Sequence, residues 1–380
     1  MKKALVLGVG SAQVELIRYL KCNGWYVIGA GYRHEGAGLS FVDRFVLLDI
    51  VDVDALSAFA KNEAIDLVYS VGSDLAVFSC AGIANRLGLK TLVSPALARQ
   101  LDNKAGLRTF LDRAQLSPVR WTSLREGFLP ESWEHFPAFI KPIRSQGQRG
   151  IVRVNSSIEL QKFITSNDGS DNGNLFLLEE ALPGREISAN VLVCDATVCF
   201  QAFSQRVTLP GIDCGIPQAH LFHDDIVTTE EREALSELIQ SVVTALEMQN
   251  GPLYFQLKMT PAGPKIIEFT PRLDGCHLWR LIYHSCGFDL LDAVFSLLEE
   301  QVPVLPHSAV YQPCTLEFFF ERPGTQFDRS RHPFPMDTLY GEYYYQSGEL
   351  VRPINGHMEK VGYVIREGIP LEFKNGGRRP

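Results

Sequence analysis

The sequence has no run of basic residues, no CxxC pair and no long apolar segment, and each absence excludes a class of protein. The net charge of −8 and the lack of a Lys/Arg-rich run argue against nucleic acid or an anionic membrane surface as the main partner. No apolar stretch approaches the roughly 18 residues that a membrane-spanning helix needs. The start, MKKALVLGVG, lacks a signal-peptide cleavage site and is more typical of a first β-strand.

The cysteines form no metal or redox motif. They stand at positions 22, 80, 194, 199, 214, 276, 286 and 314, several of them in apolar runs such as VLVCDATVCF. We therefore expect reduced, mostly buried thiols in a cytoplasmic protein. His220 and His223, in HLFHDD, lack further metal ligands, so a loop or a helix entry explains them better than a metal site.

Two familiar nucleotide-binding motifs are incomplete or missing. GVGSAQ follows the first apolar run, but Gln13 stands where the third small residue of a dinucleotide-binding turn belongs, and no acidic residue ends the second strand at GAGYR. We expect these glycines to serve a tight turn rather than a nicotinamide or flavin site. No GxxxxGK[ST] is present, which excludes a P-loop.

The first hundred residues alternate strand and helix patterns. Helices are expected over 11–23, 54–61 and 75–87, with Gly24 and Gly88 placed to end the first and the third. Strands are expected in ALVLG, WYVIGA, RFVLLDI, DLVYSV and LKTLVS. This order predicts the α/β class, with a Rossmann-like parallel sheet covered by helices on both faces.

The rest of the chain has a different pattern. A helix should begin at Ser94 and end before Pro118, and Thr228–Met248 is the clearest helix, with Glu231 completing a capping box. Its strands are expected in FPAFIKP, GIVRV, NLFLLEEAL, the hairpin LYFQLKM–TPAGP–KIIEFT, and a small antiparallel C-terminal unit of TLEFFFE, TLYGEYYYQ and KVGYVIRE. The terminal KNGGRRP is expected to be disordered.

Four segments with polar side chains stand out in this second part of the chain. Lys104 lies on a helix, and Lys141 ends a strand ahead of the loop RSQGQRG. LLEEALPGREIS ends another strand with two glutamates and then reaches Glu186. The segments FQLKM and IIEFTPRLDG place Gln256 and Glu268 on neighbouring strands, with Arg272 just beyond.

Together these pieces suit a nucleotide triphosphate held between two small sheets. Two lysines can neutralise phosphate oxygens, and a glycine-rich loop can offer backbone N–H groups to them. A strand edge can pair with adenine, and a carboxylate can bind both ribose hydroxyls. Oxygen donors on adjacent strands can hold Mg²⁺, which uses few protein ligands.

On these motifs, in this order, the sequence resembles the ATP-grasp superfamily of carboxylate–amine ligases over nearly its whole length. The resemblance implies a Rossmann-like domain over residues 1–95, an ATP-grasp nucleotide-binding domain of two α+β subdomains over 96–300, and a C-terminal β-rich region over 301–380 that completes the fold. It implies ATP with Mg²⁺ or Mn²⁺ as cofactors, small-molecule carboxylate and amine substrates, and a homodimer as the candidate assembly.

The resemblance also assigns roles to particular residues. Lys104 and Lys141 would contact the phosphates, and 145–150 would form a lid over them. Glu268 would be the main metal ligand, with Gln256 and Thr270 beside it, and Arg272 would bind the phosphorylated carboxylate. Glu179, Glu180 and Leu182 would lie at the adenine, and Glu186 at the ribose. The implied catalytic residues are Arg272 and Lys141. The full set of implied ATP-binding residues is Lys104, Lys141, Ser145, Gln146, Gly147, Gly150, Glu179, Glu180, Leu182 and Glu186.

Two positions depart from the commonest pattern of the family. Gln256 stands in place of the first metal-binding carboxylate, and Thr270 in place of the usual Asn. An amide oxygen is still a hard ligand, but the lost charge should weaken metal binding, and Thr270 offers only a hydroxyl. Gln256 could also be a structural strand residue.

The function expected is therefore ATP-dependent ligation: a carboxylate is activated as an acyl phosphate and joined to an amine, with release of ADP and phosphate. Three alternatives stay open. One is carboxyphosphate chemistry like that of purine-pathway or carbamoyl-phosphate-synthase relatives, one is a non-catalytic ATP-binding module, and the weakest is a dinucleotide oxidoreductase. The sequence does not identify the carboxylate or the amine.

Overall fold

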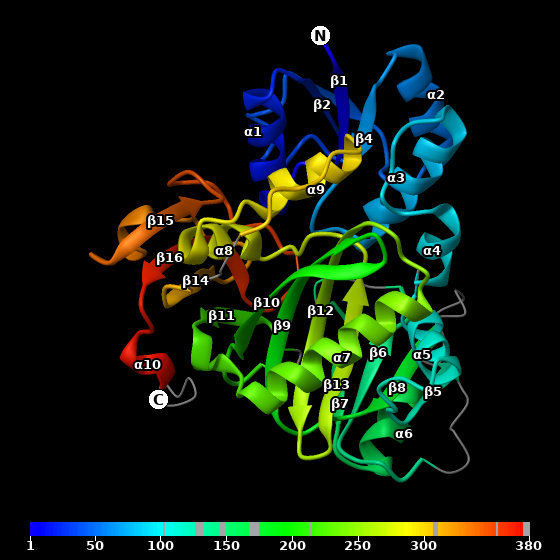
Figure 1. The fold of residues 1–380 in the computed structure, drawn as a ribbon. Coiled ribbons are helices and arrows are strands. Elements are labelled where there is room, and N and C mark those ends of the chain that lie inside the picture. Colours follow the sequence, from blue (N-terminus) through cyan, green and yellow to red (C-terminus); the bar gives the residue numbers. More distant parts are fainter. Residues whose placement is uncertain are drawn as a thin grey trace.

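The chain folds into three β-sheets with helices packed around them (Figure 1). The computed structural model describes residues 1–101, 103–125, 133–144, 147, 149–166, 175–212, 215–306, 311–354 and 356–374. One sheet is parallel and lies near the N-terminus, one is a four-stranded antiparallel sheet, and one is a large eight-stranded antiparallel sheet. This architecture confirms the predicted α/β class, with a parallel-sheet unit ahead of a two-part α+β region.

The N-terminal sheet has the strand order β3-β2-β1-β4. Its elements are β1 (Lys3–Leu7), η1 (Ser11–Gln13), α1 (Val14–Cys22), β2 (Tyr26–Gly31), β3 (Arg44–Leu47), α2 (Val53–Asn62), β4 (Leu67–Tyr69) and α3 (Asp74–Leu87). The fifth strand predicted here, in LKTLVS, is wrong. Thr91 Oγ1 donates to the carbonyl of Val93 and accepts from its N–H, at 3.1 and 3.2 Å, and this local turn competes with strand pairing.

The single helix predicted from Ser94 is divided into two, α4 (Pro95–Gln100) and α5 (Lys104–Arg113). Asn103 causes the second start: its Oδ1 accepts a hydrogen bond from the Gly106 N–H at 2.8 Å, and Asn is a preferred N-cap residue. Lys104 is therefore the first residue of α5. Its own N–H donates to the Ile143 carbonyl at 3.3 Å, which ties the start of the helix to the end of β6 (Ala138–Pro142).

The four-stranded sheet has the order β5-β8-β6-β7. Besides β6 it contains β5 (Trp121–Arg125), β7 (Val152–Val154) and β8 (Leu175–Glu180), with α6 (Ser157–Ser166) beside it. Ile140, Leu160 and Leu178 form part of its own small core and are almost fully buried. Lys141 and Glu179 thus stand on adjacent strands that are held rigidly by this core.

The large sheet runs β13-β12-β9-β10-β11-β14-β16-β15. Its strands are β9 (Arg185–Cys194), β10 (Thr197–Thr208), β11 (Pro217–Phe222), β12 (Gly251–Thr260), β13 (Gly263–Thr270), β14 (Cys314–Glu321), β15 (Thr338–Tyr343) and β16 (Glu359–Glu367). The predicted β12–β13 hairpin is confirmed. The three C-terminal strands are antiparallel, as expected, and continue the large sheet because β14 pairs with β11.

Helices cover this sheet on both sides (Figure 1). The helices of this part of the chain are η2 (Asp224–Ile226), α7 (Thr229–Ala245), α8 (Leu278–Cys286), α9 (Leu290–Leu298), η3 (Arg329–Arg331) and α10 (Leu371–Lys374). The predicted capping box of α7 is present: Thr228 Oγ1 accepts from the Glu231 N–H, and Glu231 Oε2 accepts from the Thr228 N–H. Residues 375–380, most of the tail for which disorder is predicted, lie outside the described residues.

The N-terminal unit packs directly on the rest of the chain. Leu16 and Leu20 of α1 share one hydrophobic core with Leu281 of α8 and Leu291 of α9. Nearby, the Gly72 N–H donates to the Leu273 carbonyl at 3.1 Å. Gly72 has φ +68°, and a Cβ there would meet the Cα of Gly275 at 2.9 Å. This close approach of two backbones fixes the segment after β13 against the N-terminal sheet.

The described residues test three expectations from the sequence: one on membrane-spanning helices, one on the cysteines and one on His220 and His223. No single helix there is long and apolar enough to cross a membrane; α8 and α9 reach that length only as a pair bent by 110°. Cys194 and Cys199 form a disulfide, so the expectation of reduced thiols is wrong for this pair, whose strands a short turn brings together. His220 is a buried strand residue of β11, whereas His223 does stand at a helix entry, before η2.

Candidate active site

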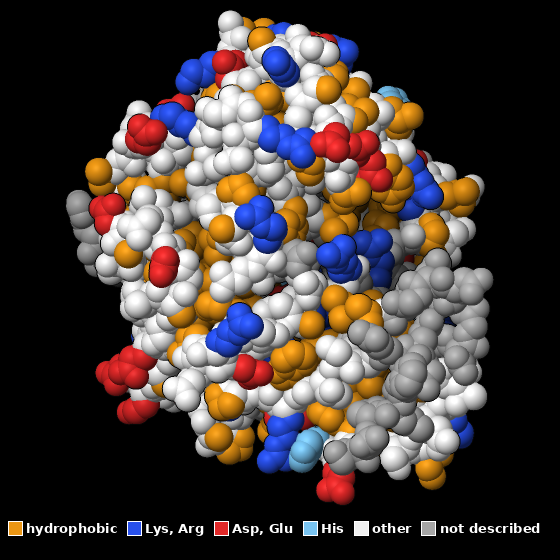
Figure 2. Space-filling view, turned by 90° about the vertical axis from the view of Figure 1, so that its right-hand side faces the viewer, with side chains coloured by type: hydrophobic (Ala, Val, Ile, Leu, Met, Phe, Trp, Pro, Cys, Tyr) orange, Lys and Arg blue, Asp and Glu red, His pale blue; other side chains and the backbone are white. Residues whose placement is uncertain are grey.

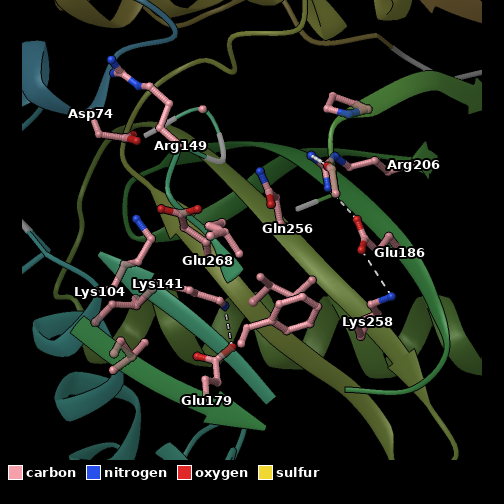
Figure 3. A pocket seen from close by; sticks show the side chains of 18 of the residues that line it. Asp74, Lys104, Lys141, Arg149, Glu179, Glu186, Arg206, Gln256, Lys258 and Glu268 are labelled. Carbon is pink, nitrogen blue, oxygen red and sulfur yellow. Dashed lines mark hydrogen bonds and ion pairs between the residues drawn. The ribbon is translucent and has the colours of Figure 1, made fainter. Parts of the chain in front are cut away.

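A cavity of about 540 Å³ lies where the small and large antiparallel sheets face each other. Side chains from both sheets, from α5 and from the segment after β13 line it (Figure 3). On the face drawn in Figure 2, Lys and Arg side chains gather near the middle of the molecule. The cavity therefore collects charged groups from segments that are distant in the sequence.

The two lysines assigned to phosphate both line this cavity. Lys141 is largely buried, and its Nζ donates to Glu179 Oε1 at 2.7 Å. An ammonium has three N–H donors, so this contact leaves Lys141 able to hold a phosphate oxygen at the same time. Figure 3 shows Lys104 and Glu268 also pointing into the cavity.

Glu179 is the centre of a buried charge cluster that the sequence did not reveal. Arg108 Nε donates to Glu179 Oε2 at 2.6 Å, opposite the contact with Lys141. Although burial acts to raise the pKa of Glu179, the Arg108 and Lys141 cations hold that pKa down at about 2. The side chain of Glu179 is thus held by these two cations. Arg108 stands one helical turn after Lys104, a spacing that could have indicated it.

Arg108 also connects three elements of the site. Its Nη1 and Nη2 donate to the carbonyls of Ile266 and Ile267, at 2.8 and 3.0 Å. One side chain of α5 therefore holds both Glu179 of the small sheet and the β13 backbone beside Glu268. This arrangement fixes the two walls of the cavity relative to each other.

Glu186, assigned to the ribose, also lines the cavity and lies between two cations (Figure 3). Arg206 Nη1 contacts its Oε2 at 2.6 Å, and Lys258 Nζ contacts its Oε1 at 3.3 Å. Burial opposes ionisation of Glu186, yet these cations lower its pKa. Each carboxylate oxygen keeps a further lone pair for a hydroxyl donor. Glu180 and Leu182, assigned to the adenine, line the same cavity.

The residues assigned to the metal are only partly brought together. Gln256 and Glu268 are direct cross-strand partners on β12 and β13, and both line the cavity. Thr270 does not line it; it is buried opposite Tyr254 and borders a second cavity, of about 530 Å³, which Glu268 also lines. A carboxylate and an amide oxygen on one wall suit Mg²⁺, which takes one or two protein ligands together with substrate phosphates. Among the described residues, no group of three or more His, Cys, Asp or Glu side chains is arranged so that it could hold a metal ion.

Arg272 lines the cavity and is held by the N-terminal unit. Its Nε and Nη2 donate to Asp74 Oδ1, at 2.8 and 2.5 Å, from the first turn of α3. Burial opposes its charge, but Asp74 raises the pKa of Arg272, and Glu268 and Asp274 add to this. The guanidinium is therefore a fixed cation near Glu268. No pattern in the sequence indicated that Asp74 is the partner of Arg272.

The segment assigned to the lid is described only in part. Ser145 and Gln146 lie outside the described residues. Gly147 lines the cavity and Gly150 borders the second one, with φ of +66° and +71°. A Cβ on Gly150 would approach Pro142 Cγ to 2.9 Å, so both φ and space favour glycine there.

Comparisons with known proteins agree with this geometry. Residues 134–278 match the family model of the ATP-grasp domain. The phosphoribosylamine–glycine ligase of Halalkalibacterium halodurans is 26% identical over 288 residues, which cover 70% of this chain and 66% of that protein. The match thus spans just under two thirds of that relative's length.

Two solved structures share the fold. The L-amino acid ligase from Bacillus licheniformis superposes with a TM-score of 0.80 at 16% identity, covering 99% of this chain and 95% of that one. The N5-carboxyaminoimidazole synthetase from Staphylococcus aureus, in complex with ADP, superposes with a TM-score of 0.75 at 14% identity, covering 98% and 95%. The chain therefore carries an ATP-grasp domain over residues 134–278 and has the fold of the ATP-grasp ligases.

Proposed function

We propose that this chain is an ATP-dependent ligase that activates a carboxylate and joins it to an amine. A carboxylate oxygen attacks the γ-phosphorus of ATP, and the bond from that phosphorus to the bridging oxygen breaks, giving an acyl phosphate and ADP. The amine nitrogen then attacks the acyl carbon and loses a proton, and phosphate leaves. The observation that carries the proposal is the convergence of Lys104, Lys141, Gln256, Glu268 and Arg272 on one cavity.

Binding of the nucleotide follows from the order of groups in the cavity. Glu180 and Leu182 would border the adenine through the end of β8, and Glu186 would accept from the ribose hydroxyls. Lys141 would donate to a phosphate oxygen while it stays on Glu179, so its position costs no reorganisation when ATP arrives. Lys104, at the start of α5, would add a second positive charge.

Glu268 and Gln256 would hold the magnesium ion that accompanies ATP. The bound ion supplies charge neutralisation for the β- and γ-phosphate oxygens. Arg272 lies close enough to Glu268 for their charges to interact, so its guanidinium is placed to orient the reacting carboxylate. Because Asp74 holds two of its N–H groups, the orientation of Arg272 depends on the N-terminal unit.

The substrates and the setting remain part of the proposal. Similar proteins are named for joining phosphoribosylamine to glycine or for ligating L-amino acids, which supports a small polar carboxylate and a small amine here. We also propose a cytoplasmic enzyme that uses Mg²⁺ or Mn²⁺ and forms a homodimer.

The test is ADP release by the full chain with ATP and Mg²⁺ over a panel of carboxylic acids, each with hydroxylamine as the nucleophile. Hydroxylamine traps an acyl phosphate as a hydroxamate, so the natural amine need not be known. We expect one acid class to give ADP and hydroxamate in equal amounts, and Glu268→Gln to give neither. ADP release with bicarbonate alone would instead identify carboxyphosphate chemistry. ATP binding without ADP release from any acid would contradict the proposal.

A further inference from the structure

The basic side chains that line the cavity differ in their partners. Five basic side chains that line it hold a carboxylate: Arg108 and Lys141 hold Glu179, Arg206 and Lys258 hold Glu186, and Arg272 holds Asp74. Lys360 of β16 also lines the cavity, but within the described residues its ammonium contacts no carboxylate. A partly buried charge without a counter-ion is costly, so this site favours a bound anion.

The immediate surroundings of Lys360 are a thiol and an aromatic ring. Its Nζ lies 3.4 Å from Cys276 Sγ and 3.6 Å from the centroid of the Phe318 ring. Burial lowers the pKa of Lys360, and nearby Arg206 lowers it further, while Cys276 and Asp274 oppose this. Neither opposing group neutralises the ammonium by an ion pair.

The carboxylate of Asp274 is occupied elsewhere. Its Oδ1 accepts from the Cys276 N–H at 2.5 Å, and both of its oxygens accept from the Leu278 N–H at 3.2 Å. Burial raises the pKa of Asp274 to about 6, so its negative charge is itself disfavoured. His220 also faces Lys360 and Arg206, and burial and these two cations lower its pKa. Burial lowers the pKa of His277 to about 3, and Lys360 and Arg280 add to this.

Strand β12 shows where this group lies in the cavity. Lys258, Gln256 and Tyr254 alternate along the strand and all line the cavity, while the intervening Phe255 and Leu257 are fully buried. Two residues advance a strand by about 6.8 Å. The cavity therefore runs from Lys258 beside Glu186, past Gln256, to Tyr254.

Cys276 and Lys360 belong to the Tyr254 end. Tyr254 is the cross-strand partner of Thr270, the last residue of β13, and Cys276 follows that strand end closely in the chain; both Tyr254 and Cys276 line the cavity. Burial and then Cys276 raise the pKa of Tyr254, which agrees with this position. Arg206, which holds Glu186, also lies near Tyr254, Cys276 and Lys360, and so joins this end of the cavity to the proposed ribose position.

We propose that Lys360 binds an anionic substituent of the acceptor, a name used here for either of the two molecules that the enzyme joins. This substituent is distinct from the carboxylate that reacts. The substituent would be a carboxylate or a phosphate on one of the two molecules that the enzyme joins. Lys360 would thereby select charged acceptors and hold the reacting group towards Glu268 and Arg272. The role assigned to the acceptor rests on the proposed ligase function, whereas the anion site itself does not.

Cys276 provides a probe of the site that needs no known substrate. The full chain is treated with two thiol reagents, anionic 2-sulfonatoethyl methanethiosulfonate and cationic 2-(trimethylammonio)ethyl methanethiosulfonate, and modification of Cys276 is followed by peptide mass spectrometry. The ratio of the two rates reports the local charge and cancels changes in thiol reactivity. We expect the anionic reagent to be favoured, and Lys360→Met and Lys360→Gln each to lower the ratio at least about fivefold.

Two variants serve as controls. Lys360→Arg keeps the charge and should keep the ratio. Lys258→Met removes a cavity cation at the Glu186 end and should leave the ratio at Cys276 unchanged. An unchanged ratio in both Lys360→Met and Lys360→Gln, or an equal fall in Lys258→Met, would overturn the proposal.

Simple ions distinguish the two sources of anion. Acetate or inorganic phosphate should slow modification of Cys276 in the unmodified chain but not in Lys360→Met, with acetamide as the neutral control. Protection by acetate indicates a carboxylate substituent, and protection by phosphate alone indicates a phosphate. Protection by neither ion overturns the proposal.

Kinetics separate failure of this inference from failure of the ligase proposal. With an acid that supports ADP release, Lys360→Met should raise the KM for the acceptor about tenfold or more and leave the KM for ATP unchanged. If no acid supports ADP release, the ligase proposal fails, and the reagent ratio still decides whether an anion site exists. If ADP release is normal and both KM values are unchanged, the Lys360 assignment fails alone.

Discussion

The two ends of the cavity are charged in different ways. At the end assigned to the nucleotide, Glu179 is held by Arg108 and Lys141 at 2.6 and 2.7 Å, and Glu186 by Arg206 and Lys258 at 2.6 and 3.3 Å. At the other end, the ammonium of Lys360 faces a thiol and a ring. One end is thus electrostatically complete before any ligand binds, and the other is not.

This difference has a physical consequence. Groups that are already paired and buried keep their positions, so a ligand that meets them need not reorganise the protein. A cation without a counter-ion gains more from a bound anion, because the desolvation cost has already been met in folding. The end with the paired Glu179 and Glu186 suits a ligand that is the same in every turnover. The end with Lys360 makes binding depend on the charge of the acceptor.

Glu268→Gln should have the largest effect on activity. Glu268 is the carboxylate directly opposite Gln256, and its removal should lower ADP release by about a thousandfold or more. Because Glu268 is only half-buried, thermal unfolding should change little. The check is initial-rate ADP release with a melting curve of the same preparation. Wild-type magnesium dependence in this variant would show that the metal position is wrong.

Lys141→Met and Arg108→Met form a matched pair that separates binding from support. Each removes one cation from Glu179 and so should destabilise the fold, by about 3 kcal/mol where a buried partner is lost. Arg108→Met should be the less stable, since Arg108 also donates to two β13 carbonyls. The loss of ATP affinity should be larger for Lys141→Met. Urea unfolding and ATP titration measure the two effects, and equal losses of affinity would remove the distinction.

Some of this arrangement follows from sequence alone. The α7 cap and the pairing of Gln256 with Glu268 are local or hairpin features, and periodicity and turn residues are sufficient to predict them. The family resemblance assigns Glu179 to the adenine, and that role stays a prediction, but the sequence did not predict the two cations that hold Glu179. Their contact spans 71 residues for Arg108 and 38 for Lys141, so no local pattern records it.

The acceptor end was missed for the same reason. Lys360 and Cys276 are separated by 84 residues, and only the pairing of β16 with β14 brings Lys360 towards the cavity. Neither residue stands in a recognisable motif. The division of one predicted helix into α4 and α5 has a local cause by contrast. Asn103 is a strong N-cap residue, and the prediction from periodicity did not take it into account.

Low pH should reveal the contribution of the buried Glu179 cluster to the free energy of unfolding. The pKa of Glu179 is about 2 in the fold against an ordinary value of 4.5, so its stabilising contribution is present above the ordinary pKa and is lost as pH falls towards about 2. Glu179→Gln should be less stable than the unmodified chain near neutral pH, and the gap should narrow as the pH falls through this window. Urea unfolding at several pH values measures it.

Glu233→Gln is the control for this pH series. Glu233 is an exposed residue of α7, so its replacement should change the free energy of unfolding little. A constant gap between Glu179→Gln and the unmodified chain across the window would contradict the cluster.

Gln256→Glu should have the smallest effect, and it tests the boundary between the two ends. The substitution adds a carboxylate directly opposite Glu268, next to the position proposed for the magnesium ion. Hard cations prefer anionic oxygen, so half-maximal activity should need several-fold less Mg²⁺. Without metal the two carboxylates repel, so the same change should lower the melting temperature slightly, and added Mg²⁺ should restore it.

Asparagine in place of Gln256 keeps the amide but shortens the side chain, and should raise the magnesium requirement instead. If both variants keep the unmodified requirement while Glu268→Gln is inactive, Glu268 holds the ion without Gln256, and Gln256 is a structural strand residue between the nucleotide and the acceptor.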